Sequence, residues 1–192
     1  MPMRLIVGLG NPGRNYIQTR HNAGYRWLEQ CAVTLGVSMQ PDAKCFGLVG
    51  SGRDAQSVHL LMPQTFMNAS GKSVGAFMRF YKIAPEDLLV VHDELDLLPG
   101  DARLKQGGGH GGHNGLKDII NVLGTQQFWR LRLGIGHPGH RDAVADWVLS
   151  PPRADESALI EDAMARSLVL LPQLLQGDFP AAMRELHTQP KR

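Results

Sequence analysis

The chain has 192 residues, 43% of them hydrophobic and 20% charged, and a formal net charge of +2 at pH 7. This composition excludes a disordered chain, and the length fits one globular domain over residues 1–192. The two cysteines form neither a disulfide framework nor a Cys-x-x-Cys ligand pair, which excludes a disulfide-stabilised secreted protein.

The first apolar run, Leu5–Val7, is too brief for a signal sequence or a membrane span, so we expect a cytoplasmic protein without membrane contact. Short apolar runs bounded by turn residues predict the strands. In chain order these runs are Arg4–Gly8, Cys45–Gly50, Ser57–Met62, Leu88–His92, Ala102–Gln106 and Arg130–Gly136. The turn residues Ser51–Asp54 predict that the second and third strands pair as a hairpin.

Apolar residues three and four positions apart predict helices. In chain order the helices cover Asn22–Leu35, Asn68–Tyr81, Leu116–Leu123, Ala143–Leu149, Ala154–Leu175 and Pro180–Leu186. Gly36 and Gly124 are placed to end two of them, Asn68 or Ser70 to cap the second, and Asn114 to cap the third. Helices and strands alternate without repeats, so we expect an α/β fold: a single-domain three-layer sandwich with a mixed, twisted β-sheet flanked by helices.

The segment Lys105–Gly115 is the least ordinary stretch of the sequence. Six of the nine residues from 107 to 115 are glycine, and the others are His110, His113 and Asn114. Such a segment cannot form core, and its peptide N–H groups are open to a ligand. Three interpretations compete: a metal site made by the histidines, an anion-binding backbone, or a flexible loop.

Basic residues gather in the same part of the chain. From Ala102 to Arg141 there is one acid, Asp118, against six Lys and Arg: Arg103, Lys105, Lys117, Arg130, Arg132 and Arg141. This balance favours a surface that faces a polyanion. The alternative is an ordinary solvated face whose acids come from elsewhere in the fold.

The segment Gly8–Gly13 matches the G-x-G-x-x-G pattern of dinucleotide-binding proteins and follows a predicted strand. That function requires a helix opening at the third glycine and an acid at the end of the next strand. Here a loop intervenes, and the acid at the expected distance, Glu29, lies inside a predicted helix. We therefore do not expect a dinucleotide cofactor.

Five polar residues follow predicted strands or precede predicted helices: Asn11, His21, Asn68, Asp93 and Asn114. Residues beyond the carboxyl ends of strands converge on one crevice in an α/β sheet. Each residue alone has a structural explanation as a turn or cap residue. Together, neutral amides and a His oriented by an Asp suit water-mediated cleavage of an ester or acyl bond without a metal.

Two other chemistries are weaker. No Gly-x-Ser-x-Gly motif is present, and the cysteines lie inside predicted elements, so a covalent nucleophile is not expected. A metal centre would use His92, Asp93, His110 and His113, but a glycine-rich loop is poorly suited to hold rigid ligands. We expect no metal and no cofactor.

Six sequence blocks together resemble the bacterial peptidyl-tRNA hydrolase family. They stand in the family's order and spacing between residue 4 and about residue 140, and the sequence after Asp142 is less distinctive. The blocks are Gly8–Gly13, Thr19–Asn22, Phe66–Gly71, His92–Asp96, Gly107–Gly115 and Arg130–Gly136.

The resemblance implies hydrolysis of the ester between a peptide and the 3′-terminal ribose of tRNA, which recycles peptidyl-tRNA dropped during translation. It implies that His21 is the general base, that Asp93 orients it, and that Asn11 distinguishes N-blocked aminoacyl groups from free ones.

The resemblance also implies a set of substrate-binding residues. Asn68 and Asn114 would hold the peptide and the terminal nucleotide, and Tyr16 and Phe66 would line the cleft. Lys105 and Arg132 would clamp a tRNA phosphate. We expect peptidyl-tRNA as the partner and a monomer as the active form. The alternatives are a non-catalytic RNA-binding relative and, third, a metal-dependent hydrolase.

Overall fold

The computed structural model describes residues 2–52 and 58–188. Its centre is a seven-stranded sheet in the order β2-β3-β4-β1-β5-β7-β6. The strands are β1 (Leu5–Gly8), β2 (Gln40–Asp42), β3 (Gly47–Ser51), β4 (His59–Pro63), β5 (Leu88–Glu94), β6 (Ala102–Gln106) and β7 (Trp129–Gly134). The four central strands β4, β1, β5 and β7 are parallel, and the pairs β2–β3, β3–β4 and β6–β7 are antiparallel, so the sheet is mixed.

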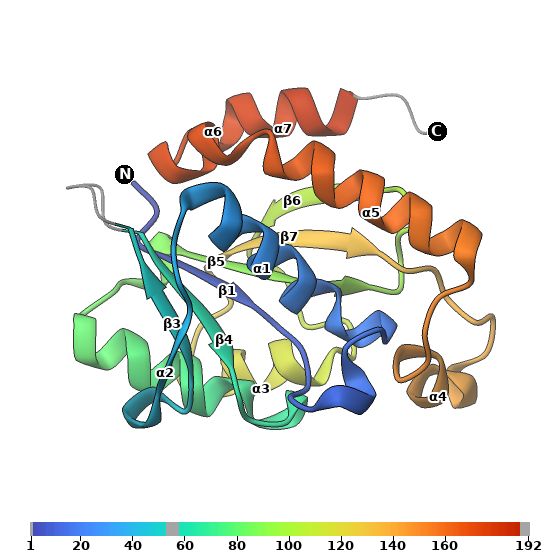
Figure 1. The fold of residues 1–192 in the computed structure, drawn as a ribbon, viewed down its shortest axis with the longest axis horizontal. Coiled ribbons are helices and arrows are strands. Elements are labelled where there is room, and N and C mark those ends of the chain that lie inside the picture. Colours follow the sequence, from blue (N-terminus) through green and yellow to red (C-terminus); the bar gives the residue numbers. More distant parts are fainter. Residues whose placement is uncertain (1, 53–57, 189–192) are drawn as a thin grey trace.

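Helices cover both faces of the sheet, which confirms the predicted three-layer sandwich. Figure 1 shows α1, α5, α6 and α7 on one face and α2 and α3 on the other. The helices are α1 (Ala23–Leu35), α2 (Ser70–Tyr81), α3 (Asn114–Leu123), α4 (Val144–Val148), α5 (Ala154–Leu168), α6 (Leu171–Gln176) and α7 (Phe179–Thr188). Within the described ranges, no helix has both the length and the apolarity needed to cross a bilayer.

The central strands are apolar throughout because both of their faces are buried. In β1, Leu5 and Val7 pack toward α2 and α3, whereas Ile6 packs toward α1 and the carboxyl-terminal helices. All three are fully buried. This double burial explains why the short apolar runs predicted strands correctly.

The predicted hairpin is confirmed as the antiparallel pair β3–β4, although residues 53 and 54 of the predicted turn lie outside the described residues. Several predicted boundaries were wrong, most of them by one or two residues, and two of these differences have a clear physical reason. Cys45 belongs to a short 3-10 turn, so β3 begins only at Gly47. The single helix predicted for Ala154–Leu175 is divided into α5 and α6, because Pro172 has no N–H and is confined to the first turn of a helix.

Strand β2 was not predicted because its residues are polar or turn-forming and largely exposed at the sheet edge. The N-cap predicted for α2 was also wrong. The cap position is Ala69, without a side-chain bond, and the Ser70 hydroxyl donates to the carbonyl of Met67 at 2.7 Å. The predicted helix ends at Gly36 and Gly124 are confirmed, since both adopt the left-handed conformation.

The amino-terminal glycines allow α1 to approach the sheet closely. A Cβ on Gly24 would lie 2.3 Å from the carbonyl oxygen of Val91, and a Cβ on Gly10 would lie 2.5 Å from the ring of Tyr25. Gly13 is followed by short 3-10 turns, and α1 begins only at Ala23. The G-x-G-x-x-G pattern therefore serves helix–sheet packing here, and it places the turn before α1 against β5.

Candidate active site

The carboxyl ends of the parallel strands bring the predicted site residues to one edge of the sheet. The chain leaves β1 toward Asn11 and His21, leaves β4 toward Phe66 and Asn68, and carries Asp93 near the end of β5. His21, Asp93 and Asn114 line one hollow, together with two residues of α4, Val144 and Val148.

Asp93 lies at the centre of this hollow and is only 3% exposed. Its Oδ2 accepts a hydrogen bond from Nδ1 of His21 at 2.8 Å, and its Oδ1 accepts one from Nε2 of His113, also at 2.8 Å. The N–H of Leu116 donates to Nδ1 of His113, which fixes the proton of a neutral His113 on Nε2. One buried carboxylate is therefore shared by two imidazoles.

The electrostatics of this cluster follow from burial and charge. Burial alone lowers the pKa of His21, but the charge of Asp93 and its hydrogen bond raise it by more, so the pKa lies above its ordinary value. Burial alone raises the pKa of Asp93, but the charges and hydrogen bonds of His21 and His113 lower it well below its usual range. Asp93 is therefore ionised and holds His21 in an orientation that leaves Nε2 available.

The metal-binding alternative predicted from sequence is not assembled as proposed. His92 is buried, and its Nδ1 donates to the main-chain carbonyl of Asp93. Burial lowers the pKa of His92 to about 3, so it is neutral. Ligand atoms of His21, Asp93 and His113 lie within 4.8 Å of one another, but His92 and His110 are not part of that set. Both oxygens of Asp93 already accept imidazole hydrogen bonds.

Three hydrogen bonds fix Asn11 in place. Asn22 accepts from its main-chain N–H at 2.8 Å and donates to its main-chain carbonyl at 2.9 Å. Oδ1 of Asn11 accepts from the main-chain N–H of Met67 at 2.7 Å. This use of the oxygen fixes the amide, and the side-chain NH₂ has no hydrogen-bond partner within the described residues. Asn11 therefore presents donors only.

The remaining predicted cleft residues lie on the flanking loops. Tyr16 and Phe66 meet edge to face with ring centroids 6.4 Å apart, and Phe66 is 60% exposed. Asn68 is exposed on the turn before α2. The cap predicted for Asn114 was wrong, because His113 accepts from the N–H of Leu116 and caps α3. The Asn114 side chain is exposed, and its amide has no hydrogen-bond partner within residues 2–52 and 58–188.

Arg130 holds the glycine segment in place. Its buried guanidinium donates to the carbonyls of Gly108 and Gly109 at 2.5 and 2.6 Å. Gly111 and Gly112 have φ values of 57° and 83°, in the left-handed region where a side chain is strained. The hydrogen bonds of Arg130 therefore hold the glycine segment in a path that brings His113 to Asp93.

The alternation of β6 and β7 puts four basic side chains on the α3 side of the sheet: Arg103, Lys105, Arg130 and Arg132. Arg132 is paired with Glu94 at 2.8 Å, and Arg130 is occupied by the glycine segment. Lys105 is exposed, and neither it nor Arg103 has an ion pair within the described ranges. Lys105 and Arg132 line a common hollow with His92 and Arg130. For Arg132 the alternative interpretation is confirmed, since its acid comes from β5, and the polyanion-facing surface stays a prediction.

A profile of the family described as "Peptidyl-tRNA hydrolase" matches residues 5–192. The chain belongs to the peptidyl-tRNA hydrolase family. The peptidyl-tRNA hydrolase of Nitrosospira multiformis is 57% identical over 188 residues, covering 97% of this chain and 98% of the relative. That of Methylobacillus flagellatus is 58% identical over 189 residues, covering 98% of each.

The fold agrees with solved structures of peptidyl-tRNA hydrolases. The crystal structure of peptidyl-tRNA hydrolase from Acinetobacter baumannii superimposes with a TM-score of 0.95 at 47% identity, covering 99% of this chain and 97% of that one. The predicted family and fold class are therefore confirmed.

Sequence reasoning missed the anchoring role of Arg20, which precedes His21 in the family block Thr19–Asn22. Arg20 is buried, pairs with Glu156 at 3.0 Å and donates to the carbonyl and hydroxyl of Ser150. Its guanidinium lies 3.5 Å from the ring centroid of Trp147. These contacts fix α4 against the cleft. Arg20 and Glu156 are far apart in the sequence, so no local pattern reveals that they pair.

Proposed function

We propose that this peptidyl-tRNA hydrolase family member cleaves the ester between the peptide, or an N-blocked aminoacyl group, and the 3′-terminal ribose of tRNA. The products are free tRNA and a free peptide, which recycles peptidyl-tRNA dropped during translation. The proposal rests mainly on the buried His21–Asp93 pair, joined at 2.8 Å beside a hollow at the carboxyl ends of the parallel strands. Family membership supports the same reaction.

In the proposed mechanism, Nε2 of neutral His21 takes a proton from a water molecule, and the resulting hydroxide attacks the ester carbonyl carbon. The carbonyl–ribose oxygen bond then breaks. The proton on His21 passes to the departing 3′ oxygen of the ribose, and the peptide leaves as a carboxylic acid, which loses its proton to water. Asp93 stabilises the imidazolium between these steps, in agreement with the raised pKa of His21.

Asn11 supplies the selectivity in this proposal. Its NH₂ donates to the carbonyl of the group that blocks the amino acid, because its oxygen is already used by Met67. A free α-amino group offers no such carbonyl and is cationic, so it is rejected. Asn68 and Asn114 hold the peptide and terminal nucleotide.

Tyr16 and Phe66 form one wall of the proposed cleft. Lys105 and Arg132 contact a tRNA phosphate, and Arg103, on the same side of the sheet, extends this basic surface. Since His21, Asp93 and Asn114 of a single chain line one hollow, the site needs no second copy, and we propose that the active form is a monomer.

The deciding experiment compares N-acetyl-aminoacyl-tRNA with unblocked aminoacyl-tRNA under the same conditions. Release from the blocked substrate alone is expected. Equal release from both would contradict the role of Asn11, and release from neither would support a non-catalytic RNA-binding protein. A metal-dependent hydrolase is the third candidate, since the ligand atoms of His21, Asp93 and His113 cluster within 4.8 Å. Loss of activity in EDTA that zinc restores would favour it.

A further inference from the structure

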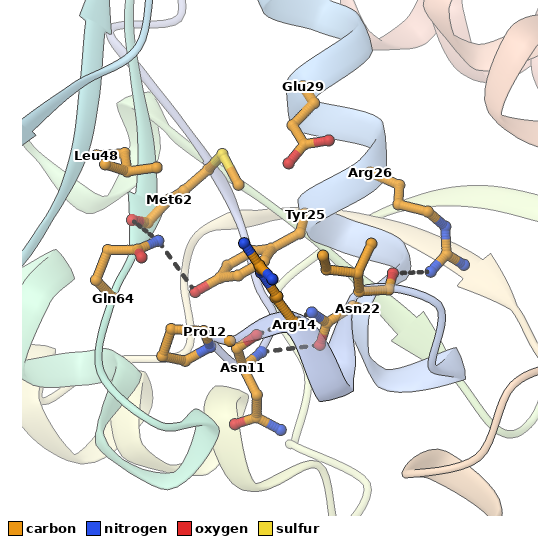
Figure 2. Close-up of a pocket in the computed structure, with 12 residues that line it drawn as sticks. Asn11, Pro12, Arg14, Asn22, Tyr25, Arg26, Glu29, Leu48, Met62 and Gln64 are labelled. Carbon is orange, nitrogen blue, oxygen red and sulfur yellow. Dashed lines mark hydrogen bonds between the residues drawn. The ribbon is translucent and has the colours of Figure 1, made fainter.

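A second hollow of about 290 Å³ lies beside the loop that holds Asn11, and Asn11 is one of the residues that line it (Figure 2). Its walls are the loop after β1, one side of α1, and residues of β3 and β4 with the segment that follows. We call it the α1 pocket. The residues that define its chemistry are Arg14, Tyr25, Glu29, Leu48, Met62 and Gln64. The reaction proposed above uses none of them.

The inner part of the α1 pocket is apolar. Tyr25 and Met62 are 7% and 3% exposed, and Leu48 is half-buried beside them. The hydroxyl of Tyr25 donates to the carbonyl of Pro63 and is therefore already satisfied. An apolar side chain can enter here without leaving a polar group unpaired.

Polar groups of both kinds surround this apolar floor. Arg14 and Glu29 are exposed, and neither forms a hydrogen bond or ion pair within residues 2–52 and 58–188. Among the described residues, the side-chain amide of Gln64 makes two long contacts, each of 3.5 Å. Burial raises the pKa of Glu29 by more than the charge of Arg26 lowers it. The positive charge of Arg26 therefore does not fully offset the partial burial of this carboxylate. The donors of Arg14 and Gln64 and the acceptor of Glu29 can pair with the main chain of a peptide. The apolar floor below them can receive one of its side chains.

The same two loops form both the candidate active site and the α1 pocket. The first loop carries Asn11 and Arg14, which both line the α1 pocket, and Tyr16, whose ring meets that of Phe66 on the second loop. The second loop also carries Gln64 of the pocket. Figure 2 shows the side chain of Asn11 pointing away from Glu29. The rim of the α1 pocket beside Asn11 includes Pro12 and Gly13, and Gly13 has no side chain. An extended peptide advances about 3.3 Å per residue and needs only a few residues to cross this rim.

We propose that the α1 pocket binds the part of the substrate peptide that lies upstream of the residue esterified to tRNA. An apolar side chain of that segment packs on Leu48 and Met62, Arg14 and Gln64 donate to its carbonyls, and Glu29 accepts from its N–H groups. This subsite rests on the proposed function and extends it, because it makes peptide length and sequence part of substrate recognition.

The test uses two tRNA substrates that end in the same amino acid. One is N-acetyl-aminoacyl-tRNA, which reaches only as far as Asn11. The other is an N-acetylated pentapeptidyl-tRNA with leucines at its upstream positions. Both are given to the wild type, to Leu48→Asp and to the double variant R14A/Q64A. Arg184→Ala, an exposed arginine on α7, is the matched control.

The pocket variants are expected to raise KM for the pentapeptidyl substrate by about five- to tenfold, the effect of losing one partly buried apolar contact or its polar partners. Their KM for the N-acetyl substrate and their kcat should match the control. If Leu48→Asp does not fold, the KM values of R14A/Q64A decide whether the subsite exists. Equal KM values for variants and wild type, or equal rises for both substrates, would overturn the subsite. If the wild type hydrolyses neither substrate, the proposed function fails and the subsite fails with it.

Discussion

His113 donates to Oδ1 of Asp93 at 2.8 Å, on the carboxylate oxygen that His21 does not use. The two imidazole ring centroids are 5.0 Å apart. His113 therefore competes with His21 for the same negative charge, and its own orientation is fixed by the amino terminus of α3. The basicity of His21 depends on a residue of the glycine segment.

Asp93→Asn should lower the plateau of kcat/KM by about 10²–10⁴-fold, since the imidazolium loses its counter-charge and the orientation of His21 is no longer fixed. The acid limb of the pH profile should also move. The general base must be neutral, so the rate rises with pH through the pKa of His21. Asp93 raises that pKa, whereas burial alone lowers it, so the limb should shift to lower pH in the variant. An acid limb at the same pH in the variant and the wild type would contradict the effect of Asp93 on the pKa of His21.

His113→Asn should shift the same limb in the opposite direction. Asparagine keeps the capping function at the start of α3 but is too short to replace the imidazole at Asp93. Without that donor, the pKa of Asp93 rises and its hydrogen bond to His21 strengthens, so the pKa of His21 rises further. The measurement is kcat/KM from pH 5 to 8 for His113→Asn and Asp93→Asn under the same conditions. Shifts of the same sign in both variants would disprove the competition between the two histidines.

Arg130→Met should lower the free energy of unfolding by about 1–3 kcal/mol, because two partly buried hydrogen bonds to carbonyls of the glycine segment are lost. It should also raise KM, since the same segment leads to His113 and Asn114. Denaturant unfolding and steady-state kinetics measure the two effects. Arg141→Met, at an exposed position, provides the control for stability. A variant with unchanged stability would show that Arg130 does not brace the segment.

Lys105→Ala should flatten the salt dependence of tRNA binding by about one unit of log–log slope, the value for one lost phosphate contact. Lys105 is exposed, whereas Arg132 already pairs with Glu94, so the effect of Arg132→Ala should be smaller. Binding is measured across a range of salt concentrations. Lys44→Ala, in the turn between β2 and β3, should leave the slope as it is. An unaltered slope for Lys105→Ala would remove this lysine from the tRNA contact.

The sequence predicted the sheet and the His21–Asp93 pairing because both depend on local signals. Apolar runs give strands buried on both faces, and residues beyond the carboxyl ends of parallel strands converge. The partnership of His113 with Asp93 could not be predicted in this way, since it needs a glycine segment to fold back along a path set by Arg130. The cap of α3 was missed for a related reason: asparagine is the better cap residue by propensity, but the histidine occupies the position.

The most direct test of the proposed mechanism is the turnover of His21→Asn on N-acetyl-aminoacyl-tRNA, with tRNA binding measured in parallel. His140→Asn, an exposed histidine outside the cleft, is the matched control. We expect the rate of peptide release to fall by about 10²–10⁴-fold for His21→Asn while its affinity for tRNA and the activity of the control remain those of the wild type. A His21→Asn variant that releases the aminoacyl group at the wild-type rate would contradict the assignment of His21 as the general base.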